Sequence, residues 1–183
     1  MLIYLAVAVI AIVAAVLVAA ARKPDVFEVS RSATIHAAPE RIFALLADFR
    51  DWQSWSPYER KDPAMKRSFP GATSGVGALY RFDGNREAGT GELRIVEVEA
   101  PTKLAVTLTM TKPMACHNRV TFTLDPAPGG TLVTWHMAGA CPFMGKVMGT
   151  LFNMDRMVGG DFERGLSTLK QFAERPHLVT AAA

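Results

Sequence analysis

Apolar and polar residues alternate in five successive segments between Gly75 and Cys141, at residues 76–82, 91–98, 104–110, 118–124 and 132–137. A period of two is typical of half-buried strands, and strands that follow one another closely form antiparallel hairpins. Residues that favour turns separate the segments, at 83–85, 100–102, 112–113 and 125–130. The pattern therefore predicts five consecutive antiparallel strands.

A sixth strand is expected at residues 29–35, where Val29, Ala33 and Ile35 alternate with hydroxyl side chains. Arg31 is the exception, because it falls on the apolar face of this strand. A helix is expected to follow the strand, since Pro39 stands in its first turn and apolar residues recur at helical spacing. These residues are Ile42, Phe43, Leu45, Leu46 and Phe49.

After Pro142 the apolar period returns to 3.6, and Phe162, Leu166, Leu169 and Phe172 form one face of a last helix. Gly159-Gly160 is expected to interrupt this longer helical stretch. The order of elements predicts an α+β domain in which a curved six-stranded antiparallel sheet wraps around a long C-terminal helix. An apolar cavity is expected where the sheet and the helix do not touch.

The first 21 residues carry no charge and are almost all Ala, Val, Ile and Leu. As a helix they would measure roughly 31 Å, against a hydrocarbon core of roughly 30 Å. A cleaved signal is the alternative, since Ala19-Ala20-Ala21 offers a cleavage site, but no Lys or Arg precedes the long apolar run. We expect an uncleaved anchor. Arg22 and Lys23 then place the domain in the cytoplasm, as part of a single-pass inner or plasma membrane protein.

The chain is thus expected to divide into a transmembrane helix at 1–21, a linker at 22–28, one folded domain at 29–175 and a disordered tail at 176–183. Nothing in the sequence predicts the oligomeric state.

The chain carries a set of motifs at 37–43, Trp52, 55–57, 75–77, 84–85, 89–91, 112–113, Asn118, 134–135, 143–146 and 154–163. These motifs resemble those of the START-like, Bet v 1-like superfamily (SRPBCC), which contains polyketide cyclases, aromatases and lipid-transfer proteins. The resemblance covers about residues 28 to 175, and its tail is similar to an uncharacterised bacterial branch whose members often carry an N-terminal anchor. It implies the helix-grip fold with a hydrophobic pocket.

Three classes of function find no support in the sequence. The net charge is only +3 and no block of like charges occurs, which argues against nucleic acid as a partner. Cys116 and Cys141 are the only cysteines, and no His/Cys cluster has metal-ligand spacing. The Gly-x-Gly pairs at 75–77 and 89–91 do not stand between a strand and a helix, so they do not predict nucleotide binding. We expect no metal and no cofactor.

The residues expected to contact a ligand are aromatic, aliphatic and Met side chains on the inner face of the sheet, in the aromatic segment at 52–58 and on the C-terminal helices. They are Trp52, Trp55, Tyr58, Tyr80, Phe82, Leu93, Leu108, Met110, Phe122, Trp135, Met137, Met148, Phe152 and Phe162. The aromatic segment has two readings, a lid over an apolar ligand or a plug that seals the core. Tyr80, His117 and Asn118 are the candidate catalytic residues.

The leading hypothesis is that the domain binds a lipid or another hydrophobic small molecule close to the membrane, for transport or sensing. The alternative is a polyketide cyclase-like or aromatase-like enzyme, in which Tyr80, His117 or Asn118 polarises a carbonyl group. A third hypothesis is an interaction module whose cavity has collapsed. Polar groups that converge inside the domain would favour the enzyme, and a filled interior would favour the interaction module.

Overall fold

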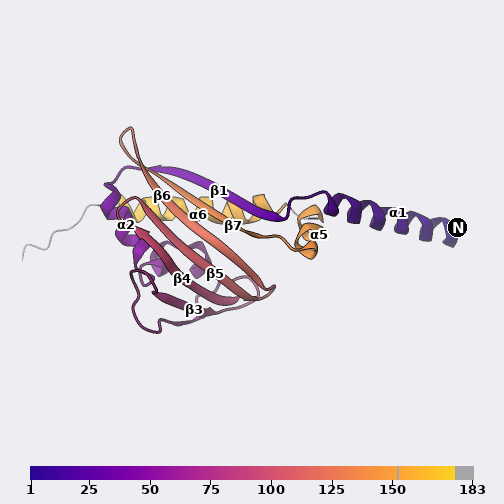
Figure 1. Ribbon diagram of the computed structural model, residues 1–183, viewed down its shortest axis with the longest axis horizontal. Helices are drawn as coiled ribbons and strands as arrows, with labels where there is room; N and C mark the ends of the chain where they lie inside the picture. The colour runs from indigo at the N-terminus through magenta and orange to yellow at the C-terminus, as the bar shows by residue number, and fades with distance from the viewer. Residues whose placement is uncertain (152, 176–183) are drawn as a thin grey trace, which may run out of the picture.

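The computed structural model describes residues 1–151 and 153–175 and contains one antiparallel sheet that wraps around a long helix (Figure 1). The strands lie in the order β1-β7-β6-β5-β4-β3-β2. Their bounds are β1 (Val26–Ile35), β2 (Lys66–Ser68), β3 (Leu79–Asp83), β4 (Thr90–Glu99), β5 (Lys103–Lys112), β6 (Cys116–Ala127) and β7 (Gly130–Ala140). The helices are α1 (Leu2–Ala21), α2 (Pro39–Ala47), α3 (Trp52–Trp55), α4 (Pro57–Lys61), α5 (Phe143–Leu151) and α6 (Met154–Ala173).

This arrangement confirms the predicted α+β class and the helix-grip fold, but the sheet has seven strands and not six. The additional strand is β2, which pairs with β3 at the edge of the sheet. Its three residues, Lys66, Arg67 and Ser68, carry no apolar alternation, because an edge strand of this length buries little. Several boundaries also differ from prediction: β1 begins at Val26, the strand expected from residue 76 begins at Leu79, and both β6 and β7 extend beyond the expected segments at each end.

The sheet has an apolar inner face and a polar outer face because the strands alternate as the sequence predicts. On β6 the side chains of Asn118, Val120, Phe122 and Leu124 are buried, whereas those between them are exposed or half-buried. On β7 the buried positions are the odd-numbered ones, including Trp135 and Met137. The even-numbered inner side chains of β6 therefore lie on the same face as the odd-numbered inner ones of β7.

The long helix α6 packs against β1 and buries Phe162, Leu166 and Leu169, as the sequence predicts. The expected interruption at Gly159-Gly160 is wrong, because both glycines lie inside α6 and the helices separate before Met154. Gly159 has another role. A Cβ atom at this position would lie 2.1 Å from Arg31 Nη2, so the glycine makes room for a guanidinium between β1 and the helix.

The short helices α2, α3 and α4 close one end of the domain. Trp52 Nε1 donates a hydrogen bond to the carbonyl oxygen of Leu46 at 2.8 Å, and Trp55 Nε1 donates to that of Leu45 at 3.0 Å. These bonds fix the aromatic segment to the end of α2, where Phe49 packs edge-on against Trp52 at 5.2 Å between ring centroids. This end is therefore filled by side chains.

The helix α1 leaves the domain at the opposite end, beside α5 (Figure 1). Its segment Ile3–Ala21 is long and apolar enough to cross a membrane, and only 6% of it is buried in the protein. The expected tail at 176–183 lies outside the described residues.

Candidate functional site

An apolar cavity of about 320 Å³ lies between the inner face of the sheet and the helices α5 and α6. The predicted ligand-contacting residues that line it are Trp52, Tyr58, Tyr80, Phe82, Leu93, Leu108, Met110, Trp135, Met137, Met148 and Phe162. The space is hydrophobic and of the size that small-molecule sites have, roughly 300 to 1,000 Å³. The interior is therefore not collapsed.

Two predicted positions do not line the cavity. Trp55 and Phe122 are fully buried and pack against each other edge-on at 6.0 Å between ring centroids. Both rings also contact Trp135, and together they fill the core beyond the inner end of the cavity. The aromatic segment is thus divided: Trp55 acts as a core plug, whereas Trp52 and Tyr58 face the cavity. Phe152 lies outside the described residues.

One row of residues crosses the whole sheet and forms the wall of the cavity. Strand register places Phe27 on β1 opposite Gly139 on β7, which is opposite Asn118 on β6. The row continues through Leu108, Leu93 and Tyr80 on β5, β4 and β3. Every member of this row except Gly139 lines the cavity. Tyr80 and Asn118 are therefore separated by two intervening strands.

A buried polar cluster surrounds Tyr80 at one side of the cavity. The Tyr80 hydroxyl donates a hydrogen bond to Glu59 Oε1 at 2.5 Å, and Arg67 Nε donates to Glu59 Oε2 at 2.6 Å. Glu59 is only 7% exposed, so this pairing satisfies a carboxylate that burial alone would destabilise. Burial, and then the hydrogen bond to Glu59, raise the pKa of Tyr80. Tyr80 therefore remains a neutral phenol, and its hydroxyl donates a hydrogen bond to the Glu59 carboxylate.

Asn118 is the second buried polar group on the cavity wall, and it is 7% exposed. Its Nδ2 atom lies 3.6 Å from Cys116 Sγ and 3.7 Å from Met137 Sδ. Sulfur is a weak acceptor, so these contacts compensate little of the cost of burying an amide. Burial raises the pKa of the neighbouring Cys116 thiol, and both cysteines are free.

The third catalytic candidate, His117, does not reach the cavity. It is exposed on the outer face of β6, where its Nδ1 atom lies 3.0 Å from Thr109 Oγ1. Since side chains alternate along a strand, the inward position of Asn118 requires that His117 points outward. The three candidates consequently do not converge on one point, and His117 is not placed to polarise a substrate carbonyl, as the enzyme alternative requires.

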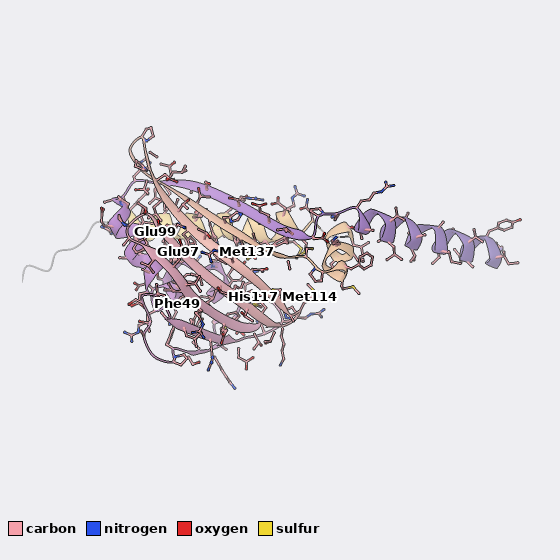
Figure 2. All side chains as sticks on the ribbon, in the orientation of Figure 1. Phe49, Glu97, Glu99, Met114, His117 and Met137 are labelled. Carbon is pink, nitrogen blue, oxygen red and sulfur yellow. The ribbon has the colours of Figure 1, made fainter. Side chains whose placement is uncertain are left out.

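The cavity opens at the end of the sheet that lies nearest α5. Its exposed lining residues belong to the β3–β4 turn, the β5–β6 turn, the junction of β7 with α5, and α5 itself. Met114 is 46% exposed and Met148 is 38% exposed at this opening. Figure 2 shows Met114 and His117 at this end of the strands, whereas Glu99 and Phe49 lie toward the closed end.

Several lining residues were missed from the sequence. Val120 shares the inner face of β6 with Asn118, so the alternation of that strand was a sufficient signal for it. Glu59, Ala88 and Cys116 gave no comparable signal, because their inward position depends on loop packing and strand ends. Within the described part of the chain, no group of three or more His, Cys, Asp or Glu side chains is placed to hold a metal ion.

Comparison with known proteins is consistent with this architecture. The family model described as polyketide cyclase / dehydrase and lipid transport matches residues 26–174. No curated protein sequence matches the chain significantly.

Three solved structures share the fold at low sequence identity. Protein MLL2253 from Mesorhizobium loti is 21% identical, with a TM-score of 0.60 over 83% of this chain and 100% of that one. Protein CV1439 from Chromobacterium violaceum is 15% identical, with a TM-score of 0.59 over 84% and 100%. The di-domain ARO/CYC protein BexL of the BE-7585A biosynthetic pathway is 13% identical, with a TM-score of 0.61 over 86% and 53%.

Proposed function

Because the chain belongs to the polyketide cyclase / dehydrase and lipid transport family, we propose that its domain binds one lipid or other hydrophobic small molecule inside the sheet. The observation that carries this proposal is the apolar cavity of about 320 Å³ between the sheet and α6. Empty apolar space of this size costs packing energy that a bound apolar molecule restores. The domain therefore binds such a molecule and encloses it.

The position of the opening supports a ligand that comes from a membrane. The opening lies beside α5, and α5 contacts α1. Two interactions hold α5 to the segment that follows α1: Lys23 Nζ donates to the carbonyl oxygen of Gly149, and Lys146 Nζ lies 2.5 Å from Asp25 Oδ1. We propose that α1 is a membrane anchor, in which case α5 and the opening lie at the bilayer surface.

The exposed side of α5 has the composition of a surface that contacts lipid. Phe143, Met144, Met148 and Leu151 are 50%, 62%, 38% and 58% exposed. At 3.6 residues per turn these four positions fall within an arc of about 140°. Arg22 and Lys23 stand between α1 and the domain, where their charges favour anionic headgroups and the cytoplasmic side of the membrane.

Binding is favoured over cyclase-like catalysis by the placement of the polar groups. Tyr80 is engaged with Glu59, His117 lies on the outer face, and Asn118 is separated from Tyr80 by two strands. Polarisation of a substrate carbonyl requires donors that meet at one oxygen atom. We therefore propose a binding protein for transport or sensing.

The three tryptophans provide a test, because all of them belong to the domain and none to α1. Trp52 and Trp135 line the cavity. We expect 11-bromoundecanoic acid, whose bromine quenches on contact, to quench tryptophan fluorescence of the full chain in lipid nanodiscs with saturation. Undecanoic acid without bromine is the control and should compete for the site. Quenching that rises linearly without saturation, and that undecanoic acid does not reverse, would show that the cavity takes no ligand.

A further inference from the structure

The amide of Asn118 is a polar group in the cavity wall that has no strong partner. Among the described residues its hydrogen-bond partners are the sulfur atoms of Cys116 and Met137, at 3.6 and 3.7 Å. A buried amide that lacks an oxygen or nitrogen partner costs roughly 1 to 3 kcal/mol. Asn118 is only 7% exposed, so bulk solvent reaches little of the side chain. The Asn118 side chain therefore lacks an oxygen or nitrogen hydrogen-bond partner in the described part of the chain.

The residue opposite Asn118 gives this amide room. Gly139 faces it on β7, and a Cβ atom at position 139 would lie 1.9 Å from Asn118 Oδ1. Any other residue at this position would displace the amide from the cavity wall. The cavity neighbour on the other side is Leu108, which is apolar. The amide therefore occupies the space left by the missing side chain of Gly139, and the apolar side chain of Leu108 lies on its other side.

Two other buried polar groups near the cavity, those of Glu59 and Trp135, are not available in the same way. Both oxygens of Glu59 are engaged, by Tyr80 and by Arg67. Trp135 Nε1 has no partner among the described residues, but the atom is sealed from the cavity and its ring stacks on Phe162 at 4.2 Å between centroids. Ser56 and Tyr58 also line the cavity, from the short helices, so Asn118 is the polar side chain of the sheet wall, beside the engaged Tyr80, that a molecule in the cavity can reach.

We infer that Asn118 hydrogen-bonds a hydroxyl or carbonyl oxygen of the ligand, so that the natural ligand is an amphiphile and not a pure hydrocarbon. This inference rests on the proposed binding function and specifies its ligand class. Asn118 lies two residues from Cys116, near the strand end that forms the opening. The polar group of the ligand is thus held toward the opening, and its apolar body extends toward Trp52 and Trp135.

The test compares 2-naphthol with naphthalene, two probes that differ by one oxygen atom. Their affinities for the full chain in lipid nanodiscs are measured by calorimetry and corrected for partition into empty discs. We expect 2-naphthol to bind about tenfold more tightly, the value of one hydrogen bond. In Asn118→Leu this preference should disappear. The matched control His117→Leu changes the next residue on the outer face and should keep the preference.

A second measurement follows ligand binding in the unchanged protein and needs a variant only to assign one resonance. The side-chain amide resonance of Asn118, assigned in ¹⁵N–¹H spectra by its loss in Asn118→Leu or Asn118→Thr, should shift with 2-naphthol and much less with naphthalene. If both probes bind equally and the resonance responds equally to both, the inference that Asn118 hydrogen-bonds the ligand is wrong, while the cavity still binds ligand. If neither probe binds, the proposed function fails and this inference fails with it.

Discussion

The guanidinium of Arg31 on β1 lies directly against the backbone of Gly159 on α6. It donates from Nε to Glu163 Oε1 at 2.8 Å and from Nη2 to Asp155 Oδ2 at 2.9 Å. The hydrogen bonds from Arg31 lower the pKa of Asp155. A charge on the inner face of the first strand is thus neutralised by two carboxylates of the helix that the sheet encloses. This contact holds α6 to β1 next to Val158 and Phe162, which line the cavity.

We predict that Gly159→Ala is less stable than Gly160→Ala by about 1 to 2 kcal/mol. Both changes gain helix propensity, about 1 kcal/mol each, so their difference isolates the contact. The new Cβ atom at 159 would meet the guanidinium carbon of Arg31 at 2.4 Å, whereas at 160 its nearest neighbour is Arg164 Nη1 at 3.6 Å. Denaturant unfolding of both variants measures the difference. Equal stabilities would show that Arg31 moves aside without loss.

The hydrogen bond from Tyr80 to Glu59 predicts a loss of stability at high pH. Burial raises the pKa of Tyr80, so the folded protein favours the protonated phenol. Its contribution is present below the ordinary tyrosine pKa of about 10 and decreases as the pH rises above it. We expect Tyr80→Phe to lose about 1 kcal/mol at pH 8, because Glu59 loses a donor. Between pH 10 and 11 the free energy of unfolding of Tyr80→Phe should fall less than that of the unchanged protein. The difference between the two decreases is up to about 1.4 kcal/mol. Urea unfolding at these pH values measures both effects, and parallel curves would contradict the account.

Strand alternation was enough to predict the sheet and most of the cavity wall. The inward positions of Leu93, Leu108 and Met137 follow from the period of two, because one face of the sheet is buried. The edge strand β2 was missed, since its three residues bury too little to leave a pattern. The break before α6 was misplaced because the glycines at 159 and 160 suggest a kink, whereas Gly159 serves a contact with Arg31 that is distant in sequence.

Side chains in the aromatic segment could not be assigned from the sequence. Trp52 and Trp55 stand three residues apart on the same short helix, and composition does not separate a ring that faces the cavity from one that fills the core. Nothing in the sequence distinguishes Glu59 from an ordinary exposed charge, because only the fold brings Arg67 and Tyr80 beside it. These outcomes depend on packing between segments, which the local pattern does not encode.

The ion pair between Lys146 and Asp25 predicts local mobility in α5 when it is removed. The Lys146 side chain is only 10% exposed, although it stands on a helix at the domain surface. Its hydrogen bond lowers the pKa of Asp25. We expect Lys146→Gln to accelerate amide hydrogen exchange severalfold at residues 143–151 and to leave α6 unchanged. Lys112→Gln, a change at the exposed end of β5, is the control. Unchanged exchange in α5 would mean that other contacts hold this helix.

The exposed apolar face of α5 predicts slower exchange of ligand with a bilayer when it is made polar. We expect the double change Phe143→Ser and Met144→Ser to slow loading of 11-bromoundecanoic acid from vesicles on the order of tenfold. The reason is that each side chain loses on the order of 1 kcal/mol of burial in lipid. Neither residue lines the cavity, so equilibrium affinity should be preserved. Stopped-flow tryptophan quenching measures the rate.

The control for this measurement is Val76→Ser, since Val76 is 69% exposed in the loop before β3, at the other end of the sheet. It should load at the rate of the unchanged protein. Equal slowing in both variants would show a general effect of surface polarity. No slowing in either would show that α5 does not contact the bilayer.

Native mass spectrometry of the full chain, released from detergent, tests the central claim most directly. We predict that the protein retains one small amphiphilic molecule per chain. Leu108→Trp, which fills the cavity from β5, should lose this molecule, whereas Thr107→Trp, whose side chain lies on the other face of the same strand, should keep it. Retention of the molecule by Leu108→Trp, or its absence from the unchanged protein in every preparation, would contradict a ligand-binding cavity.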